Sequence, residues 1–170
     1  FFYAAYDKPA AGKEFSNINE NHKIYYHKLG EAQENDRLFY ENPKQPRYFH
    51  QVSLTDDEKY MFLFESGQGA GSTLWIKDMR DEISTFVQIA DNMDYYYYPL
   101  DVINDMLYIF TNNGAPKGRV CRVSVKTPQF ENWEVLIPES DNVISSVDLA
   151  NGKMIITYDK DAANHAYVYT

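Results

Sequence analysis

Short apolar runs recur along this chain, and clusters of Gly, Asn, Asp and Pro separate them. Residues 60–64, 106–110 and 154–158 share one pattern: an apolar run, a polar loop and a second apolar run. The interval is roughly 47 residues, which lies in the range of four-stranded propeller blades. Because Val, Ile, Tyr, Phe and Thr dominate the runs, the pattern predicts β-strands and no sustained helix. Residues 78–83 are the one segment in which a helical turn is conceivable.

The predicted fold class is all-β, a partial β-propeller of about three and a half four-stranded antiparallel blades. Tight turns at 56–59, at Asn104-Asp105 and at Asn151-Gly152 are expected to join the first strand of a blade to the second. The chain is predicted to be one partial propeller domain: the end of a blade (1–42), two complete blades (43–92 and 93–140) and the start of a fourth (141–170). The predicted strands are 1–6, 23–29 and 37–41; then 47–54, 60–65, 73–78 and 85–90; then 96–104, 106–111, 119–125 and 133–137; and finally 143–150, 153–158 and 166–170.

A propeller closes into a ring, so both ends of such a segment are expected to expose unpaired strand edges. Three and a half blades are also fewer than most closed rings contain. The chain is therefore expected to be a fragment, completed either by a missing remainder or by a second copy that associates through the open edges. We favour the missing remainder.

Composition narrows the function classes. The chain is 44% hydrophobic and 16% aromatic, with a net charge of -9. Such a composition argues for a packed fold, whereas the acidic balance disfavours nucleic acid and anionic membrane surfaces. No apolar run approaches the ~20 residues that a membrane span requires. Cys121 is the single cysteine, so an intrachain disulfide is impossible, and we expect it to pack in a strand.

Five ordered segments carry a resemblance to a known family. Each motif is weak alone, whereas the ordered set is specific and covers essentially the whole chain. The segments are 23–30 (Lys-Ile-Tyr-Tyr-His-Lys-Leu-Gly), 53–60 (Ser-Leu-Thr-Asp-Asp-Glu-Lys-Tyr), 74–79 (Leu-Trp-Ile-Lys-Asp-Met), 110–120 with its Thr-Asn, Ala-Pro and Arg-Val pairs, and 133–139 (Trp-Glu-Val-Leu-Ile-Pro-Glu). They resemble motifs of the prolyl oligopeptidase (prolyl endopeptidase) propeller.

The resemblance implies a two-domain serine peptidase that cleaves short peptides after proline. In that family a seven-bladed propeller caps an α/β-hydrolase domain and excludes folded proteins and large peptides from the central cavity. The propeller holds no catalytic residue, so this segment would gate substrate access without catalysing the reaction. Its implied partners are the missing peptidase domain, the remaining blades and short proline-containing peptides. No cofactor is implied. The sequence does not reveal whether the compartment is cytoplasmic or bacterial periplasmic.

A direct search for catalytic chemistry agrees with that expectation. An α/β-hydrolase needs a Gly-x-Ser-x-Gly elbow. Gly69-Ala70-Gly71-Ser72 has the wrong spacing and is interpreted as a flexible loop. The four histidines show no metal-ligand spacing, and the carboxylates lie in separate turns. We therefore predict no catalytic residue and no metal ligand.

Loops are the better functional candidates. In this blade order, loops between second and third strands share a face with the links between blades, and in the family that face meets the peptidase domain. Those loops are 7–21, 65–72, 111–118 and 159–165. Some family members place an arginine and a cysteine in the loop that matches 65–72, and this chain has neither there. The candidate substrate-binding residues are Ser66, Gly67, Gln68, Asn112 and Arg119. The competing interpretation makes Asn112 a turn cap and pairs Arg119 with a neighbouring carboxylate.

Two other functional classes of propeller protein remain as alternatives. A non-enzymatic propeller scaffold for protein–protein interaction is disfavoured because its Trp-Asp and Gly-His signatures are absent. A polysaccharide-processing propeller is disfavoured because its Ser-x-Asp-x-Gly-x-x-Trp repeats are absent.

Overall fold

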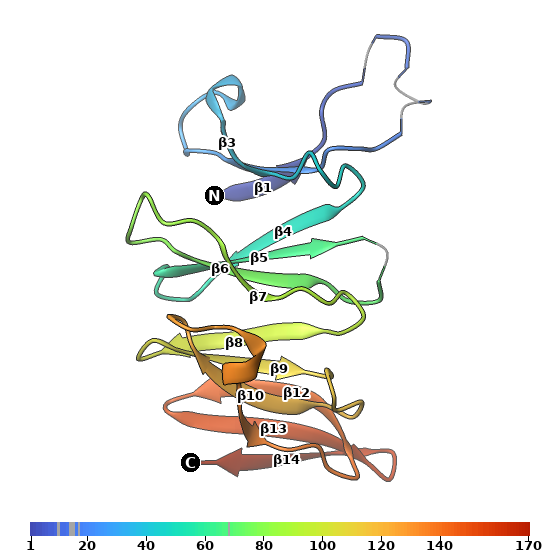
Figure 1. Cartoon of the computed structure of the whole chain (residues 1–170), viewed down its shortest axis with the longest axis vertical. Coiled ribbons are helices and arrows are strands. Elements are labelled where there is room, and N and C mark those ends of the chain that lie inside the picture. Colours follow the sequence, from blue (N-terminus) through green and yellow to red (C-terminus); the bar gives the residue numbers. More distant parts are fainter. Residues whose placement is uncertain (10, 14–15, 17, 68) are drawn as a thin grey trace.

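The computed structural model describes residues 1–9, 11–13, 16, 18–67 and 69–170. Four antiparallel sheets follow one another from the N-terminal to the C-terminal end of an elongated stack (Figure 1). None of the four closes on itself, and the predicted all-β partial propeller is confirmed. The strands are β1 (Phe2–Ala5), β2 (Lys23–Tyr26) and β3 (Arg37–Glu41); β4 (Phe49–Leu54), β5 (Tyr60–Ser66), β6 (Thr73–Asp78) and β7 (Val87–Ala90); β8 (Tyr97–Ile103), β9 (Met106–Thr111), β10 (Arg119–Ser124) and β11 (Glu134–Ile137); and β12 (Val143–Ala150), β13 (Lys153–Lys160) and β14 (Ala163–Tyr169).

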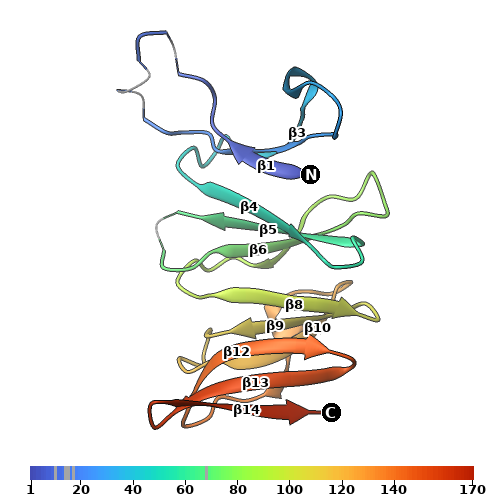
Figure 2. The ribbon, with the colours of Figure 1, turned by 180° about the vertical axis from the view of Figure 1, so that it is seen from behind.

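Strands within each sheet are ordered as they occur in the sequence, so every connection is a simple antiparallel one. The first strands of the later sheets, β4, β8 and β12, lie one after another down the stack (Figure 2). Each of them pairs on one side only, with β5, β9 and β13 respectively. The division into blades at residues 42, 92 and 140 remains a prediction.

The predicted tight turns are confirmed where the chain must reverse sharply. Asn104 and Asp105 join β8 to β9 with φ of 53° and 62°, and Asn151 and Gly152 join β12 to β13 with φ of 49° and 69°. Asn, Asp and Gly tolerate this left-handed region best, and two successive positive φ values match the right-handed twist of a hairpin.

One predicted loop is wrong. Residues 159–165 do not form a loop, because β13 extends to Lys160 and β14 begins at Ala163. Asp161 and Ala162 alone make the turn, with φ of 51° and 60°. Asp-Ala lacks the glycine that marks most such hairpins, so the sequence did not reveal the turn. Residues 78–83 form no helix; the described chain instead contains two single 3₁₀ turns, Gln33–Asn35 and Phe130–Asn132.

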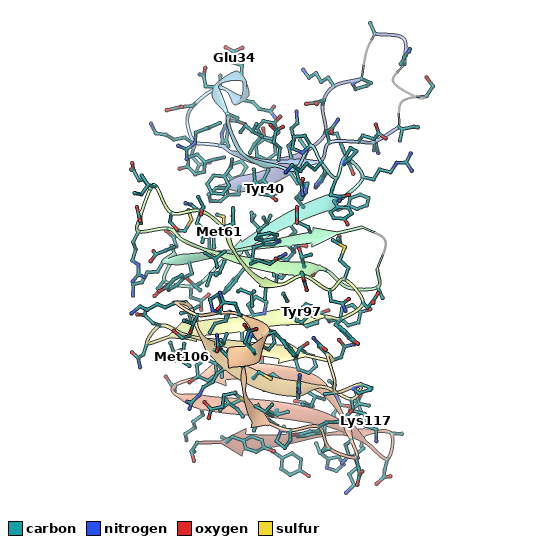
Figure 3. All side chains as sticks on the ribbon, viewed as in Figure 1. Glu34, Tyr40, Met61, Tyr97, Met106 and Lys117 are labelled. Atoms are coloured by element: carbon teal, nitrogen blue, oxygen red, sulfur yellow. The ribbon has the colours of Figure 1, made fainter. Side chains whose placement is uncertain are left out.

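Two apolar clusters join neighbouring sheets. The first lies between the second and third sheets and includes Phe62, Leu74, Tyr97 and Leu107, each at most 3% exposed. The second lies between the third and fourth sheets and includes Ile156. β5 is apolar at every position from Tyr60 to Phe64. Because a strand sends successive side chains to opposite faces, β5 has an apolar surface on both faces of its sheet. Figure 3 shows the side chains that fill the spaces between the sheets, with Met61 and Tyr97 labelled.

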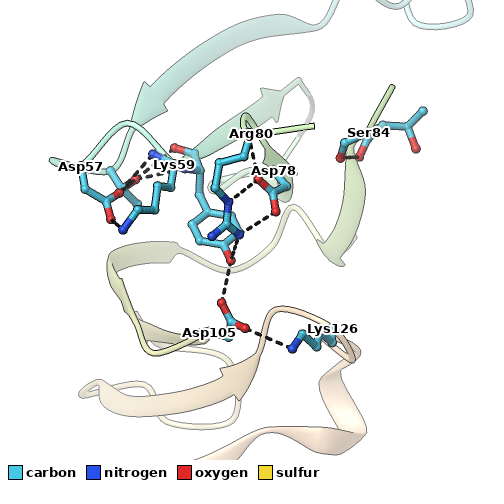
Figure 4. Close-up of polar contacts among 10 residues, drawn as sticks. Asp57, Lys59, Asp78, Arg80, Ser84, Asp105 and Lys126 are labelled. Atoms are coloured by element: carbon cyan, nitrogen blue, oxygen red, sulfur yellow. Dashed lines mark hydrogen bonds and ion pairs between the residues drawn. The ribbon is translucent and has the colours of Figure 1, made fainter. Parts of the chain in front are cut away.

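A network of polar side chains connects the second sheet to the third (Figure 4). It lies on the side of the stack where turns join the first strand of a sheet to the second. Tyr60 Oη donates to Asp105 Oδ1 at 3.0 Å and accepts from Arg80 Nη2 at 2.7 Å. Arg80 also binds Asp78, and Lys126 Nζ lies 3.1 Å from Asp105 Oδ2. Hydrogen bonds from Lys126 and Tyr60 lower the pKa of Asp105. This network of side chains holds the second and third sheets together at that side of the stack.

Candidate functional site

The loops between second and third strands lie beside the links between sheets, as the blade order predicts. The backbone N–H of Gly71, in the β5–β6 loop, donates to the carbonyl of Met93, in the link between β7 and β8, at 2.7 Å. A cavity of about 590 Å³ opens on this side. Most of the residues that line it are of polar types, and they include Asn42, Lys44, Gln45, Tyr48, Glu65, Thr73, Gln88, Asp91, Asn92 and Asp94.

The glycines of the β5–β6 loop are required by close packing. A Cβ on Gly67 would lie 2.5 Å from the Tyr48 ring. A Cβ on Gly69 or Gly71 would fall well inside van der Waals contact with the carbonyl oxygen of Met93 or Tyr95 respectively. The interpretation of residues 69–72 as a loop is retained, but the glycines there allow a close backbone approach.

We expect Gly71→Ala to destabilise the chain by about 2–4 kcal/mol, because backbone must move to make room for the methyl group. Gly152→Ala is the matched control. Its added Cβ would meet nothing within 4 Å, so only its positive φ of 69° opposes the substitution, at a cost of about 1 kcal/mol. Urea unfolding of both variants measures the difference. Equal destabilisation would contradict tight packing of this loop.

A buried polar cluster, not recognised in the sequence, supports the same side of the stack. Glu65 at the end of β5 is 3% exposed. Its Oε1 accepts hydrogen bonds from Tyr40 Oη at 2.9 Å and from Asn42 Nδ2 at 2.7 Å. His50 Nε2 lies 3.4 Å from the same oxygen, close enough for ionic attraction, although the geometry falls short of a hydrogen bond. Tyr40, labelled in Figure 3, belongs to the first sheet, so the cluster joins two sheets.

Histidine 22 completes this cluster. The backbone N–H of His50 donates to His22 Nδ1 at 2.9 Å, and His50 Nδ1 lies 2.6 Å from the carbonyl of His22. A carbonyl and a carboxylate only accept, so both ring nitrogens of His50 face acceptors. Burial and the neighbouring His50 lower the pKa of His22, in agreement with an Nδ1 that accepts.

Electrostatics of the cluster favour an ionised Glu65. Burial alone would raise its pKa, but hydrogen bonds from Asn42 and Tyr40 and the attraction of the nearby His50 ring outweigh burial, and the pKa of Glu65 is lowered. Burial and the bond to Glu65 raise the pKa of Tyr40 far above its ordinary value, so its hydroxyl stays a donor. The sequence signal for this cluster is weak, because Tyr40, His50 and Glu65 come from three different strands.

The predicted site residues are only partly brought together. Ser66 is the last residue of β5 and lines a second cleft beside Tyr96, whereas Gly67 packs on Tyr48. Gln68 lies outside the described residues. Asn112 follows β9, and its Oδ1 accepts from the backbone N–H of Tyr96, just before β8, at 2.8 Å, which is a contact between strands and not a cap within its own turn.

Arg119 begins β10, opposite Thr111 of β9. The predicted pairing with a carboxylate is wrong for the described residues, because no Asp or Glu oxygen among them lies within 4.0 Å of its guanidinium. Its Nε is buried without a hydrogen-bond partner.

The described residues contain no group of three or more His, Cys, Asp or Glu side chains able to hold a metal ion. No helix among them is both long and apolar enough to cross a bilayer.

Successive antiparallel sheets, open at both ends of the stack and joined through loops on one side, define this chain as a segment of a β-propeller. Comparison with known proteins identifies which propeller. Residues 1–170 match the prolyl oligopeptidase N-terminal β-propeller domain, and the chain belongs to the prolyl oligopeptidase family.

Relatives agree with that assignment, and a solved structure shares the fold. The chain is 32% identical to a prolyl endopeptidase of Elizabethkingia meningoseptica over 169 residues, which cover 99% of this chain and 24% of the relative. It is 27% identical to a prolyl endopeptidase of Dictyostelium discoideum, covering 99% of this chain and 25% of the relative. Prolyl oligopeptidase B of Galerina marginata, solved with a 35mer hydrolysis and macrocyclization substrate, has the same fold, with a TM-score of 0.84, 22% identity and coverage of 100% of this chain and 24% of that one. The chain thus spans about a quarter of the length of these proteins.

Proposed function

We propose that this chain is a non-catalytic part of the propeller that gates a prolyl-oligopeptidase-type serine peptidase, which cleaves short peptides after proline. The observation that carries the proposal is the match to the family's propeller domain along the entire chain. The sequence contains no Gly-x-Ser-x-Gly elbow, in keeping with a gating role without a nucleophile.

The partners in this proposal are an α/β-hydrolase domain, the remaining blades and short proline-containing peptides. The loop side described above would face the hydrolase domain. Ser66, Gly67, Gln68, Asn112 and Arg119 are proposed to contact peptide there. Of these, Arg119 alone carries a positive charge, so its guanidinium suits a carboxylate of the peptide or of the hydrolase domain. Association through the open strand edges is a further proposal.

A chimera tests the gating role. We expect residues 1–170, exchanged for the matching quarter of the Elizabethkingia meningoseptica enzyme, to give a protein that hydrolyses a short prolyl fluorogenic peptide within about tenfold of the parental rate, a loss of at most ~1.4 kcal/mol in transition-state stabilisation. The same chimera should leave a large unfolded proline-containing protein uncut, because an intact ring of blades admits only short peptides.

Controls for the chimera separate gating from general damage. The parental enzyme shows how strongly an intact ring excludes the large protein. A peptide with alanine in place of proline shows whether cleavage remains specific for proline. The isolated 170-residue chain should neither hydrolyse the peptide nor react with a serine-hydrolase probe. Cleavage of the large protein as fast as the short peptide would contradict gating, and probe labelling of the isolated chain would contradict its non-catalytic role.

A further inference from the structure

An uncharged cleft opens along the first strands of the second and third sheets. It encloses about 390 Å³ between β4 and β8, within the ~300–1,000 Å³ range of ligand sites. Its lining includes Phe49, Gln51 and Ser53 from β4, and Tyr96 to Pro99 from the start of β8. None of the lining residues is Asp, Glu, Lys or Arg, although the chain as a whole is 24% charged. His50 also lines the cleft, but it is 3% exposed and both its ring nitrogens face acceptors within the protein.

Several aromatic rings in and beside this cleft are exposed, and three of them are stacked in a row. Tyr96, Tyr98 and Phe49 are 42%, 53% and 56% exposed. The rings of Tyr96 and Tyr98 are nearly parallel, with centroids 6.1 Å apart, and Phe110 continues the row 6.0 Å beyond Tyr98. Phe110 is itself held against Gly118 and Ile144. We call Tyr96, Tyr98 and Phe110 the aromatic row.

The start of β8 is poorly suited to strand addition. Pro99 has no backbone N–H to donate, and the ladder is irregular between Pro99 and Asp101. The backbone N–H of Tyr96 is already bound to Asn112 Oδ1. Backbone pairing along β8 is therefore incomplete, and side chains provide most of the recognition of an extended partner.

Taken together, these features fit one ligand chemistry. A polyproline-type segment presents flat apolar rings, which pack on aromatic faces, and carbonyls that require hydrogen-bond donors. Tyrosine hydroxyls, the Ser53 hydroxyl and the Gln51 amide supply donors without charge. The absence of Asp, Glu, Lys and Arg from the lining favours a neutral segment over an acidic or basic one.

We infer that this cleft binds neutral, extended, proline-rich peptide segments through Phe49, Tyr96 and Tyr98. Peptide binding is inferred from the geometry of the cleft alone. Only the source of the peptide, a substrate of the peptidase, rests on the proposed function. In that setting it would hold part of a substrate while another part is cleaved. Binding is non-covalent, so the site needs no cofactor.

Isothermal titration of the 170-residue chain tests the inference. The probe is a blocked nine-residue peptide rich in proline and free of charged side chains, and the comparison peptide has alanine at each proline. We expect saturable binding of the proline peptide alone, almost unchanged between low and high salt because no ion pair contributes. Tyr98→Ala should weaken binding by about tenfold, or ~1.4 kcal/mol, because it removes an exposed aromatic face.

Matched variants keep the test decisive. Tyr98→Phe retains the ring and should retain most of the affinity, whereas Tyr167→Ala removes a similarly exposed tyrosine, 49% exposed on β14, away from the cleft, and should change nothing. Should Tyr98→Ala fail to fold by circular dichroism, Gln51→Ala replaces it, with a smaller loss expected. Equal affinity for both peptides, no binding, or preferential binding of a neutral oligosaccharide would each overturn the inference. None of these outcomes depends on hydrolysis, so they are distinct from failure of the gating proposal.

Discussion

Replacing Phe62 with alanine is expected to lower the free energy of unfolding by about 3–5 kcal/mol. Phe62 lies in the middle of β5, is 3% exposed and belongs to the cluster that joins the second and third sheets. Its removal deletes a large apolar side chain and leaves a cavity between two sheets that relax only in part. Guanidinium or urea unfolding, followed by circular dichroism, measures the change.

Ile83→Ala is the control for this effect. Ile83 is 88% exposed, so the same kind of truncation should change stability by no more than about 0.5 kcal/mol. A loss below 1 kcal/mol for Phe62→Ala would mean that the second and third sheets do not share a packed interface in solution.

Replacing Glu65 with alanine is expected to destabilise the chain by a comparable amount, about 3–5 kcal/mol. The substitution leaves the Tyr40 hydroxyl and the Asn42 amide without their buried acceptor, and it leaves His50 without the carboxylate that faces it. Glu65→Gln retains an oxygen acceptor and should cost less, about 1–3 kcal/mol. Glu134→Ala is the matched control: Glu134 forms an exposed ion pair with Arg122, and its loss should cost at most about 1 kcal/mol.

The sign of the pH dependence distinguishes this cluster from ordinary packing. The pKa of Glu65 is lower in the folded chain than its unfolded value, so the unfolded state binds the proton more tightly. The stabilisation is therefore complete above the unfolded pKa of about 4.3 and is lost as the pH falls through the folded pKa. We expect the stability difference between wild type and Glu65→Gln to shrink as the pH falls below about 4.3. A difference that grows on acidification would contradict an ionised, hydrogen-bonded Glu65.

Local sequence patterns predicted the strands well, because strand formation depends on residues close together in the chain. The recurring runs at 60–64, 106–110 and 154–158 lie within β5, β9 and β13, and the turns at Asn104-Asp105 and Asn151-Gly152 are where the turn chemistry indicated. The error arose where local chemistry is ambiguous, because Asp161-Ala162 makes a tight turn without glycine. The loop at 69–72 was predicted, but only the structure showed that its glycines serve close packing.

The candidate site was less predictable than the strands. Asn112 and Arg119 were found because they belong to a motif, yet only the structure showed that Asn112 is bound to Tyr96 and that Arg119 Nε has no partner. No local signal joins His22 to His50, which are 28 residues apart, or Tyr40 to Glu65, which are 25 apart. A lone histidine or glutamate in a strand reads as a surface residue until its neighbours in space are known.

By itself, the sequence determined that the chain is built from short antiparallel strands at a blade-like interval, and its ordered motifs indicated the prolyl oligopeptidase propeller. Alternation of side chains along a strand and the turn preferences of Asn, Asp and Gly carry that information locally. Only the tertiary structure decided which faces of neighbouring sheets meet. The buried Glu65 cluster and the uncharged cleft beside Tyr98 both lie between sheets, where residues distant in sequence create an environment that none of the segments has alone.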